Sequence, residues 1–278
     1  MNPEEKLQFL KKIPQHAQRS EEWFNQRKDK LTSSDAGTAL GINPYQKPVE
    51  LLYKKCGAEI KPFVGNVATL HGQKYEDEAI EHYCNATGSE NHEFGLIAYD
   101  EVERSQDIHA NKNYPNGIYW MAGSTDGIAY EKTPCMFNKK SCELIVLEVK
   151  CPYKREIIHG KIPGYYYPQV QLNMAILDIE KADFIEYNPP GHNNKPMELN
   201  IVRVDRDRYW FDKNVKILES FWKEVEYWRE KGIINHPDYN KYHKKSKTIE
   251  LDLSDWLIDD QNLKTPLEEG SQLFLDSD

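Results

Sequence analysis

A short acidic and basic motif ends the most apolar run of the chain. In LIVLEVK, Glu148 and Lys150 alternate with aliphatic residues, so a strand places both on the same side, together with Val146. Asp126 lies in the turn GSTDG between two strand-like runs. Mg²⁺ prefers one or two carboxylates plus waters and phosphate oxygens, lowers the pKa of bound water and stabilises a transferring phosphate. The pattern predicts a metal site at which Lys150 orients a nucleophilic water. The structural alternatives are an ion pair at a strand end and an ordinary Asp-Gly turn.

A third carboxylate occupies the core-directed face of a predicted helix. With helical spacing, Glu76 shares a face with Gly72, Ala79, Ile80 and Tyr83. An acid on a buried face needs a partner or an ion. Glu76 is therefore a candidate metal ligand, and an unremarkable exposed acid is the alternative. Together the three acids and Lys150 are typical of a metal-dependent phosphodiesterase.

A candidate anion site precedes these residues in the sequence. Arg27 follows Trp23 by four positions, and Ser34 comes just before a short helix. An arginine fork and a hydroxyl at a helix start suit a phosphate group, although a solvated basic loop has the same pattern. Gln169 and Gln171 lie at the start of a later predicted helix and are further candidates for this site. The alternative is that both side chains are simply exposed to solvent.

The surrounding pattern predicts an α/β domain with a mixed central sheet flanked by helices. Residues 143–150 are apolar on both faces, which favours a strand covered on both sides. The expected helices are 34–40, 48–56, 66–87, 168–178 and 207–231, and the other expected strands are 95–99, 118–122, 127–130, 182–187 and 199–204.

Composition and charge limit the class of protein. Of the 278 residues, 39% are hydrophobic and 29% charged, which excludes disorder for the bulk of the chain. The apolar runs are too short to span a bilayer and no secretory leader is evident, so we expect a soluble, intracellular protein.

Five cysteines without a CxxC pair argue for free thiols and against a zinc or iron–sulfur site. Of the net charge of −9, residues 249–278 carry nine acids and one base, so the body is almost neutral.

Five segments resemble, in order, the YqaJ-type viral recombinases, the group of the lambda phage exonuclease within the PD-(D/E)xK nuclease superfamily. They are WFNQRKDKLTSSDAG, HGQKYEDEAIEHYCNATG, AGSTDGI, LEVKCPY and YYYPQVQLNMAI, and they span about residues 20–190. Each segment is weak alone, but five in the right order are specific. The resemblance implies a restriction-endonuclease-like core.

The resemblance also implies roles for individual residues. Glu76, Asp126 and Glu148 match the family's acidic metal-site residues, and Lys150 matches its catalytic lysine. The positions that hold a DNA 5′-phosphate in relatives are matched by Arg27, Ser34, Ser124 and Gln169. The implied activity is Mg²⁺-dependent digestion of double-stranded DNA from 5′ ends, with Mn²⁺ as a substitute. It leaves 3′ overhangs that a single-strand annealing protein uses in recombination or repair, and the best-known relatives form ring-shaped trimers.

Two segments depart from the phage enzyme. Residues 131–142 look like an inserted loop or hairpin, and the acidic tail has no counterpart. We therefore predict a nuclease domain over residues 1–248 and an appended tail over 249–278. The alternatives are an endonuclease of the same superfamily that cuts internally or at branched DNA, and a non-catalytic DNA-binding subunit on the same fold.

Overall fold

The structure is a computed structural model that describes residues 1–58, 66–105, 118–133 and 141–240. The α-helices are α1 (Pro3–Lys12), α2 (Glu21–Lys28), α3 (Ala36–Ala39), α4 (Pro48–Lys55), α5 (Val67–Thr87), α6 (Tyr99–Ser105), α7 (Tyr167–Leu177) and α8 (Arg208–Lys231). The strands are β1 (Leu31–Thr32), β2 (Glu90–His92), β3 (Leu96–Ala98), β4 (Met121–Ser124), β5 (Gly127–Thr133), β6 (Ser141–Lys150), β7 (Lys181–Asn188) and β8 (Glu198–Asp205). Three short 3₁₀ turns are η1 (Ser33–Asp35), η2 (His192–Asn194) and η3 (Ile233–Asn235).

The strands form a larger and a smaller sheet. The five-stranded sheet has the order β2-β5-β6-β7-β8, with β6 and β7 parallel and the other neighbours antiparallel. The three-stranded sheet has the order β1-β4-β3. Because β4 runs into β5 through the Thr125–Asp126 turn, this turn lies where the two sheets meet.

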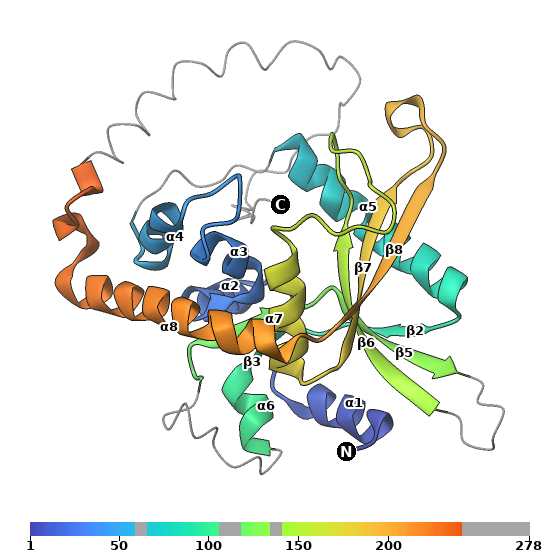
Figure 1. Cartoon of the computed structure of the whole chain (residues 1–278), viewed down its shortest axis with the longest axis horizontal. Helices are drawn as coiled ribbons and strands as arrows, with labels where there is room; N and C mark the ends of the chain where they lie inside the picture. The colour runs from blue at the N-terminus through green and yellow to red at the C-terminus, as the bar shows by residue number, and fades with distance from the viewer. Residues whose placement is uncertain (59–65, 106–117, 134–140, 241–278) are drawn as a thin grey trace.

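Helices cover both faces of the larger sheet, with α7 on one side and α5 on the other (Figure 1). Alternation along β6 explains this arrangement. Ile145 and Leu147 pack with Ala79 and Tyr83 of α5, whereas Val146 belongs to the core that includes α7. The prediction of a strand covered on both faces and of a mixed α/β fold is confirmed.

Helix α7 is the centre of the fold. It lies between the larger sheet and α8, and every residue from Pro168 to Leu177 is buried. Its polar residues are used internally. Gln171, for example, donates to the Asp205 carbonyl at 3.0 Å and accepts from the Asp207 N–H at 2.7 Å, which ties α7 to the start of α8. The interpretation of Gln169 and Gln171 as exposed residues is therefore wrong.

Most expected elements are present, with small shifts. The expected helix 66–87 is α5, with Asn66 as its N-terminal cap and Gly88 in a left-handed conformation just after its end. The expected strand 118–122 corresponds to β4, which begins three residues later and ends two residues later. Ser34 lies inside η1 and does not cap a helix, because Thr32 precedes this turn.

Two predictions fall partly or wholly outside the described residues. The ends of the expected insertion, 131–133 and 141–142, pair as a hairpin of β5 and β6, and residues 134–140 lie outside the described part. The acidic tail, 249–278, lies entirely outside it. Within the described ranges, none of the helices has the length and apolar character needed to cross a membrane.

Candidate active site

The β4–β5 turn fixes Asp126 against the end of β6. The Asp126 N–H donates to the Leu147 carbonyl at 3.2 Å, and its Oδ2 accepts from the Val149 N–H at 2.6 Å. Thr125 adds a hydroxyl bond to the same Leu147 carbonyl at 2.6 Å. Gly127 follows and lies close to the Asn91 amide, so that a Cβ at this position would lie 2.1 Å from Asn91 Oδ1 and would displace that side chain. The motif STDG thus holds one carboxylate beside Glu148.

Glu148 is completely buried, and α7 holds both of its carboxylate oxygens. Gln169 Nε2 donates to Oε1 at 2.5 Å, and Asn173 Nδ2 donates to Oε2 at 3.1 Å. Lys150 Nζ lies 3.2 Å from the same Oε1. A buried carboxylate is stable only when it is paired and hydrogen-bonded. The Glu148 carboxylate at the end of β6 is therefore held in one orientation by two amide donors and one ammonium group.

Lys150 and Glu76 complete the group from two different elements. The Lys150 ammonium lies 5.1 Å from the centre of the Tyr166 ring, just before α7, and its residue is 7% exposed. Glu76 on α5 accepts from Arg19 Nη2 at 3.0 Å. The side chains of Arg19 and Glu76 are 42% and 26% exposed, so this ion pair is open to solvent, and the role of Glu76 at a metal remains a prediction.

Electrostatics show that these acids act on one another. Desolvation raises the pKa of Asp126 well above its usual value, and the neighbouring carboxylates of Glu148 and Glu76 raise it further. Lys150 and the Val149 N–H oppose this effect. A position at which negative charges crowd together is one at which a cation binds favourably.

The donor set fits a hard divalent cation with few protein ligands. Among the described residues, no three or more His, Cys, Asp or Glu side chains form a complete metal-binding cluster. Mg²⁺ does not require one, because it retains waters and takes phosphate oxygens from a substrate. Asp126 and Glu148 would hold the ion, with Glu76 binding it or one of its waters. These assignments remain predictions.

The candidate anion site brings Arg27 and Ser34 into contact. Arg27 Nη2 donates to Ser34 Oγ at 2.8 Å and reaches Thr32 Oγ1 at 3.4 Å. The guanidinium carbon lies 4.3 Å from the centre of the Trp23 ring, which orients it. Arg27 and Ser34 are both partly exposed. A guanidinium and a hydroxyl that share one accessible corner suit a phosphate group.

Ser124 and Gln169, the other two predicted phosphate-binding residues, come from neighbouring elements. Ser124 is the last residue of β4 and Gln169 lies in the first turn of α7, and both elements pack against η1, which contains Ser34. The amide of Gln169, however, donates to Glu148. The structure therefore gives Gln169 a clear role in holding this carboxylate, and its contact with a phosphate remains a prediction.

Sequence reasoning missed Asn173 and Arg19. Asn173 follows Gln169 by four residues, so both lie on one helical face, and this spacing could have revealed the second amide facing Glu148. Arg19 gave no such signal, because it precedes α2 in a left-handed conformation with a φ of 69° and contacts Glu76 from 57 residues away.

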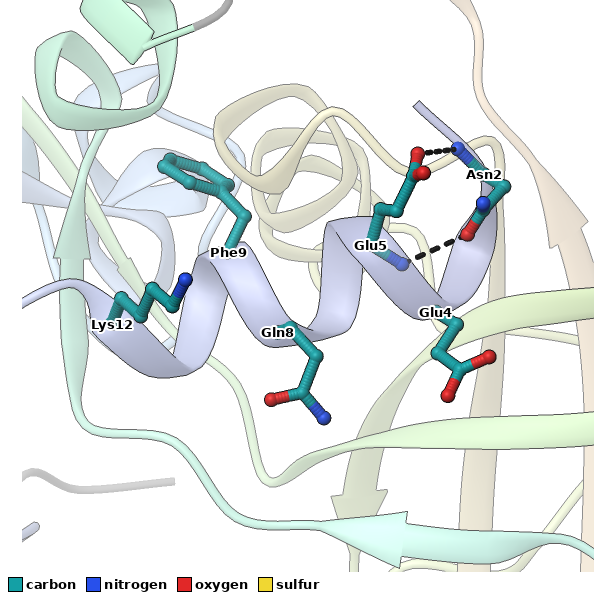
Figure 2. Close-up of a pocket in the computed structure, with 6 residues that line it drawn as sticks. All are labelled: Asn2, Glu4, Glu5, Gln8, Phe9 and Lys12. Atoms are coloured by element: carbon teal, nitrogen blue, oxygen red, sulfur yellow. Dashed lines mark hydrogen bonds between the residues drawn. The ribbon is translucent and has the colours of Figure 1, made fainter.

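A surface hollow lies along α1 (Figure 2), and none of the predicted site residues lines it. It is lined by Asn2, Glu4, Glu5, Gln8, Phe9 and Lys12. Figure 2 shows the reciprocal bonds between Asn2 and Glu5 that cap the helix at one end of this hollow. Another face of α1 lines a depression with Glu143 and Leu144, near the beginning of β6. Glu148 and Lys150 lie at the opposite end of this strand.

Solved structures with a similar fold include an alkaline exonuclease, LHK-Exo, from Laribacter hongkongensis. Its structure matches with a TM-score of 0.55 and 21% identity, covering 83% of this chain and 100% of that one. LHK-Exo in complex with dAMP matches with a TM-score of 0.56, 22% identity and the same coverage. At this identity the likeness establishes the fold alone.

Sequence comparisons identify the family. An uncharacterized protein of Acanthamoeba polyphaga mimivirus is 32% identical over 190 residues, which are 65% of this chain and 31% of that protein. A protein of African swine fever virus (strain Badajoz 1971 Vero-adapted) is 26% identical over 178 residues, 61% of this chain and 48% of that protein. The chain thus spans about a third to a half of the length of these relatives. The family model of the YqaJ-like viral recombinase domain matches residues 22–180, and the chain belongs to this family.

Proposed function

We propose that the chain is a metal-dependent deoxyribonuclease that digests double-stranded DNA from 5′ ends and leaves 3′ overhangs. The observation that carries this proposal is the convergence of Asp126, Glu148 and Lys150 at the end of β6, beside Glu76. Family membership and a fold shared with an alkaline exonuclease support it. Mg²⁺ or Mn²⁺ would neutralise charge on the scissile phosphate and acidify a bound water.

The residues of the chain have separable tasks in this proposal. Asp126 and Glu148 supply carboxylate oxygens that are already oriented by backbone and amide donors, so little reorganisation is needed when substrate binds. Lys150 has its ammonium anchored between Glu148 and the Tyr166 ring. From there it would orient the attacking water and stabilise negative charge that develops on the phosphate.

A direct test uses linear duplex DNA labelled separately at its 5′ and 3′ ends. We expect release of the 5′ label as mononucleotides in Mg²⁺, a persistent 3′-terminated strand, and no digestion in EDTA. A covalently closed circle is the matched control. Cutting of the circle would favour the endonuclease alternative, and binding of linear DNA without cleavage would favour a non-catalytic subunit.

The partly exposed Arg27–Ser34 corner predicts a preference among DNA ends. A 5′-phosphorylated end should be digested faster than a 5′-hydroxyl end, and Arg27→Ala should reduce the difference because it removes a charged donor to the phosphate. The loss should be roughly tenfold or more, since a hydrogen bond to a charged group contributes about 1.5–3 kcal/mol. Equal wild-type rates on the two ends would contradict this prediction.

The product of this reaction suggests the partners. A 3′ overhang is the substrate of a single-strand annealing protein, so such a protein is the partner we propose. A ring-shaped trimer around DNA, as in the best-known relatives, is the assembly to test. Light scattering of the full chain with and without duplex DNA would measure it.

A further inference from the structure

A buried ion pair lies directly behind the Arg27–Ser34 corner. Lys55 Nζ, on the last residue of α4, is 2.6 Å from Asp35 Oδ2 in η1. The side chains of Lys55 and Asp35 are only 6% and 9% exposed. Neither is accessible enough to form a binding surface itself, so their effect must pass through the groups that they contact.

The Asp35 carboxylate fixes the direction of a hydroxyl that faces Arg27. Besides Lys55, its Oδ2 accepts from the Thr32 N–H at 3.0 Å and from Thr32 Oγ1 at 2.7 Å. Because the Thr32 hydroxyl proton points to Asp35, the oxygen presents its lone pairs to Arg27 Nη2 and to Ser34 Oγ, 3.4 and 3.0 Å away. Thr32 is fully buried and thus holds this orientation.

The Lys55 ammonium also holds the backbone that carries Arg27. Lys55 Nζ donates to the Arg27 carbonyl at 3.0 Å. The carbonyl of Lys55 in turn accepts from Arg229 Nε of α8 at 3.0 Å. One ammonium therefore joins the end of α2, the turn η1 and the end of α4. The spacing between the Arg27 guanidinium and Ser34 depends on these three elements.

We propose that Lys55 and Asp35 are positioning residues for the Arg27–Ser34 corner and that they set the preference of the chain for a 5′-terminal phosphate. This inference rests on the proposed function. Without the ammonium, Asp35 would be a buried carboxylate with fewer donors, which is unfavourable unless it takes up a proton or water. Either change releases Thr32 and the Arg27 backbone, so Arg27 and Ser34 no longer converge on one anion.

A second buried lysine provides a matched control. Lys6 Nζ pairs with Asp178 Oδ2 at 3.2 Å, and the Lys6 side chain is 8% exposed. This pair lies at the end of α7, away from the Arg27–Ser34 corner. The Asp178 side chain is 38% exposed, so the lysines are matched in burial but their partners are not. If a buried, ion-paired lysine only stabilises the fold, Lys55→Met should leave the preference between DNA ends unchanged, as Lys6→Met is expected to do.

The experiment uses the full chain with each substitution and a duplex whose 5′ end carries either a phosphate or a hydroxyl. Affinity for the two duplexes is measured in EDTA by fluorescence anisotropy, which does not require cleavage. kcat and KM for both ends are then measured in Mg²⁺. Lys55→Arg tests rescue by a second cation. Thr32→Val removes only the hydroxyl that links Asp35 to Arg27. It provides the same test of end preference if Lys55→Met does not fold.

We expect the wild type to bind and digest the phosphorylated end preferentially. Lys55→Met should lose roughly tenfold of this preference, about 1.4 kcal/mol, mainly through KM. Thr32→Val should lose part of it, Lys55→Arg should retain part of it, and Lys6→Met should retain it all. An unchanged preference in both Lys55→Met and Thr32→Val, or an equal loss in Lys6→Met, would overturn the inference. Failure of the proposed function would look different, because the wild type would then not digest either duplex.

Discussion

Replacing Glu148 by glutamine or Lys150 by alanine is expected to slow the digestion of duplex DNA ends severely while DNA binding survives. Glu148 is fixed by two amides and Lys150 by Glu148 and an aromatic ring, so each variant removes a charge from a preorganised position. Loss of one such electrostatic group slows a reaction by roughly a hundred- to a thousandfold. Single-turnover rates on end-labelled DNA, with affinity measured separately in EDTA, test this expectation.

Asp183→Asn is a suitable control for these variants. Asp183 is 1% exposed and also lies in the larger sheet, but it faces α5, where it accepts from the Tyr83 hydroxyl at 2.8 Å and from Arg203. It should lower stability and leave the cleavage rate of the folded protein almost unchanged. Near-wild-type digestion by folded Glu148→Gln or Lys150→Ala would show that the assignment of the active site is wrong.

Asp126→Asn should inactivate the chain and at the same time stabilise the metal-free fold. Desolvation and the carboxylates of Glu148 and Glu76 raise the pKa of Asp126 on folding. Its contribution to stability is therefore present below the pKa of the unfolded chain and is lost as the pH rises through the pKa of the folded state. Above the pKa of the unfolded chain the cost of charging Asp126 opposes folding, and asparagine removes this cost while its amide oxygen still accepts from the Val149 N–H.

Thermal unfolding with and without Mg²⁺ measures this trade-off. A gain of about 1 kcal/mol would raise the Tm by about 2–4 °C in a domain of this size. Mg²⁺ should stabilise the wild type, because it binds the folded state, and should stabilise Asp126→Asn much less. A variant that melts below the metal-free wild type, or that digests DNA normally, would rule out a crowded carboxylate site at this position.

The elements with complete local signals could be predicted from the sequence. One example is the buried strand β6, whose apolar residues on both faces indicate a strand covered on both sides. Another is α5, because Asn66 and Gly88 mark its two ends. Pro168 likewise marks the first turn of α7. The candidate site followed from the same signals, because Glu148 and Lys150 interrupt the clearest strand of the chain.

Other features depend on contacts between distant residues. The strand β2 has no apolar alternation of its own and forms by pairing of residues 90–92 with β5. The position of β4 is determined by its parallel pairing with Leu31 and Thr32 and by its antiparallel pairing with β3. The Lys55–Asp35 pair joins residues 20 positions apart on two short helical segments. No local pattern contains this information, since it arises only when the elements pack together.

The burial of α7 has a consequence for the way in which the protein loses activity. This helix supplies both amides that hold Glu148, and the same helix is enclosed between the larger sheet and α8. Its peptide groups cannot reach solvent by local fraying, so we expect the slowest amide hydrogen exchange of the chain there, at the rate of global unfolding. The catalytic geometry would then persist until the whole domain opens, and heat inactivation would coincide with the cooperative unfolding transition.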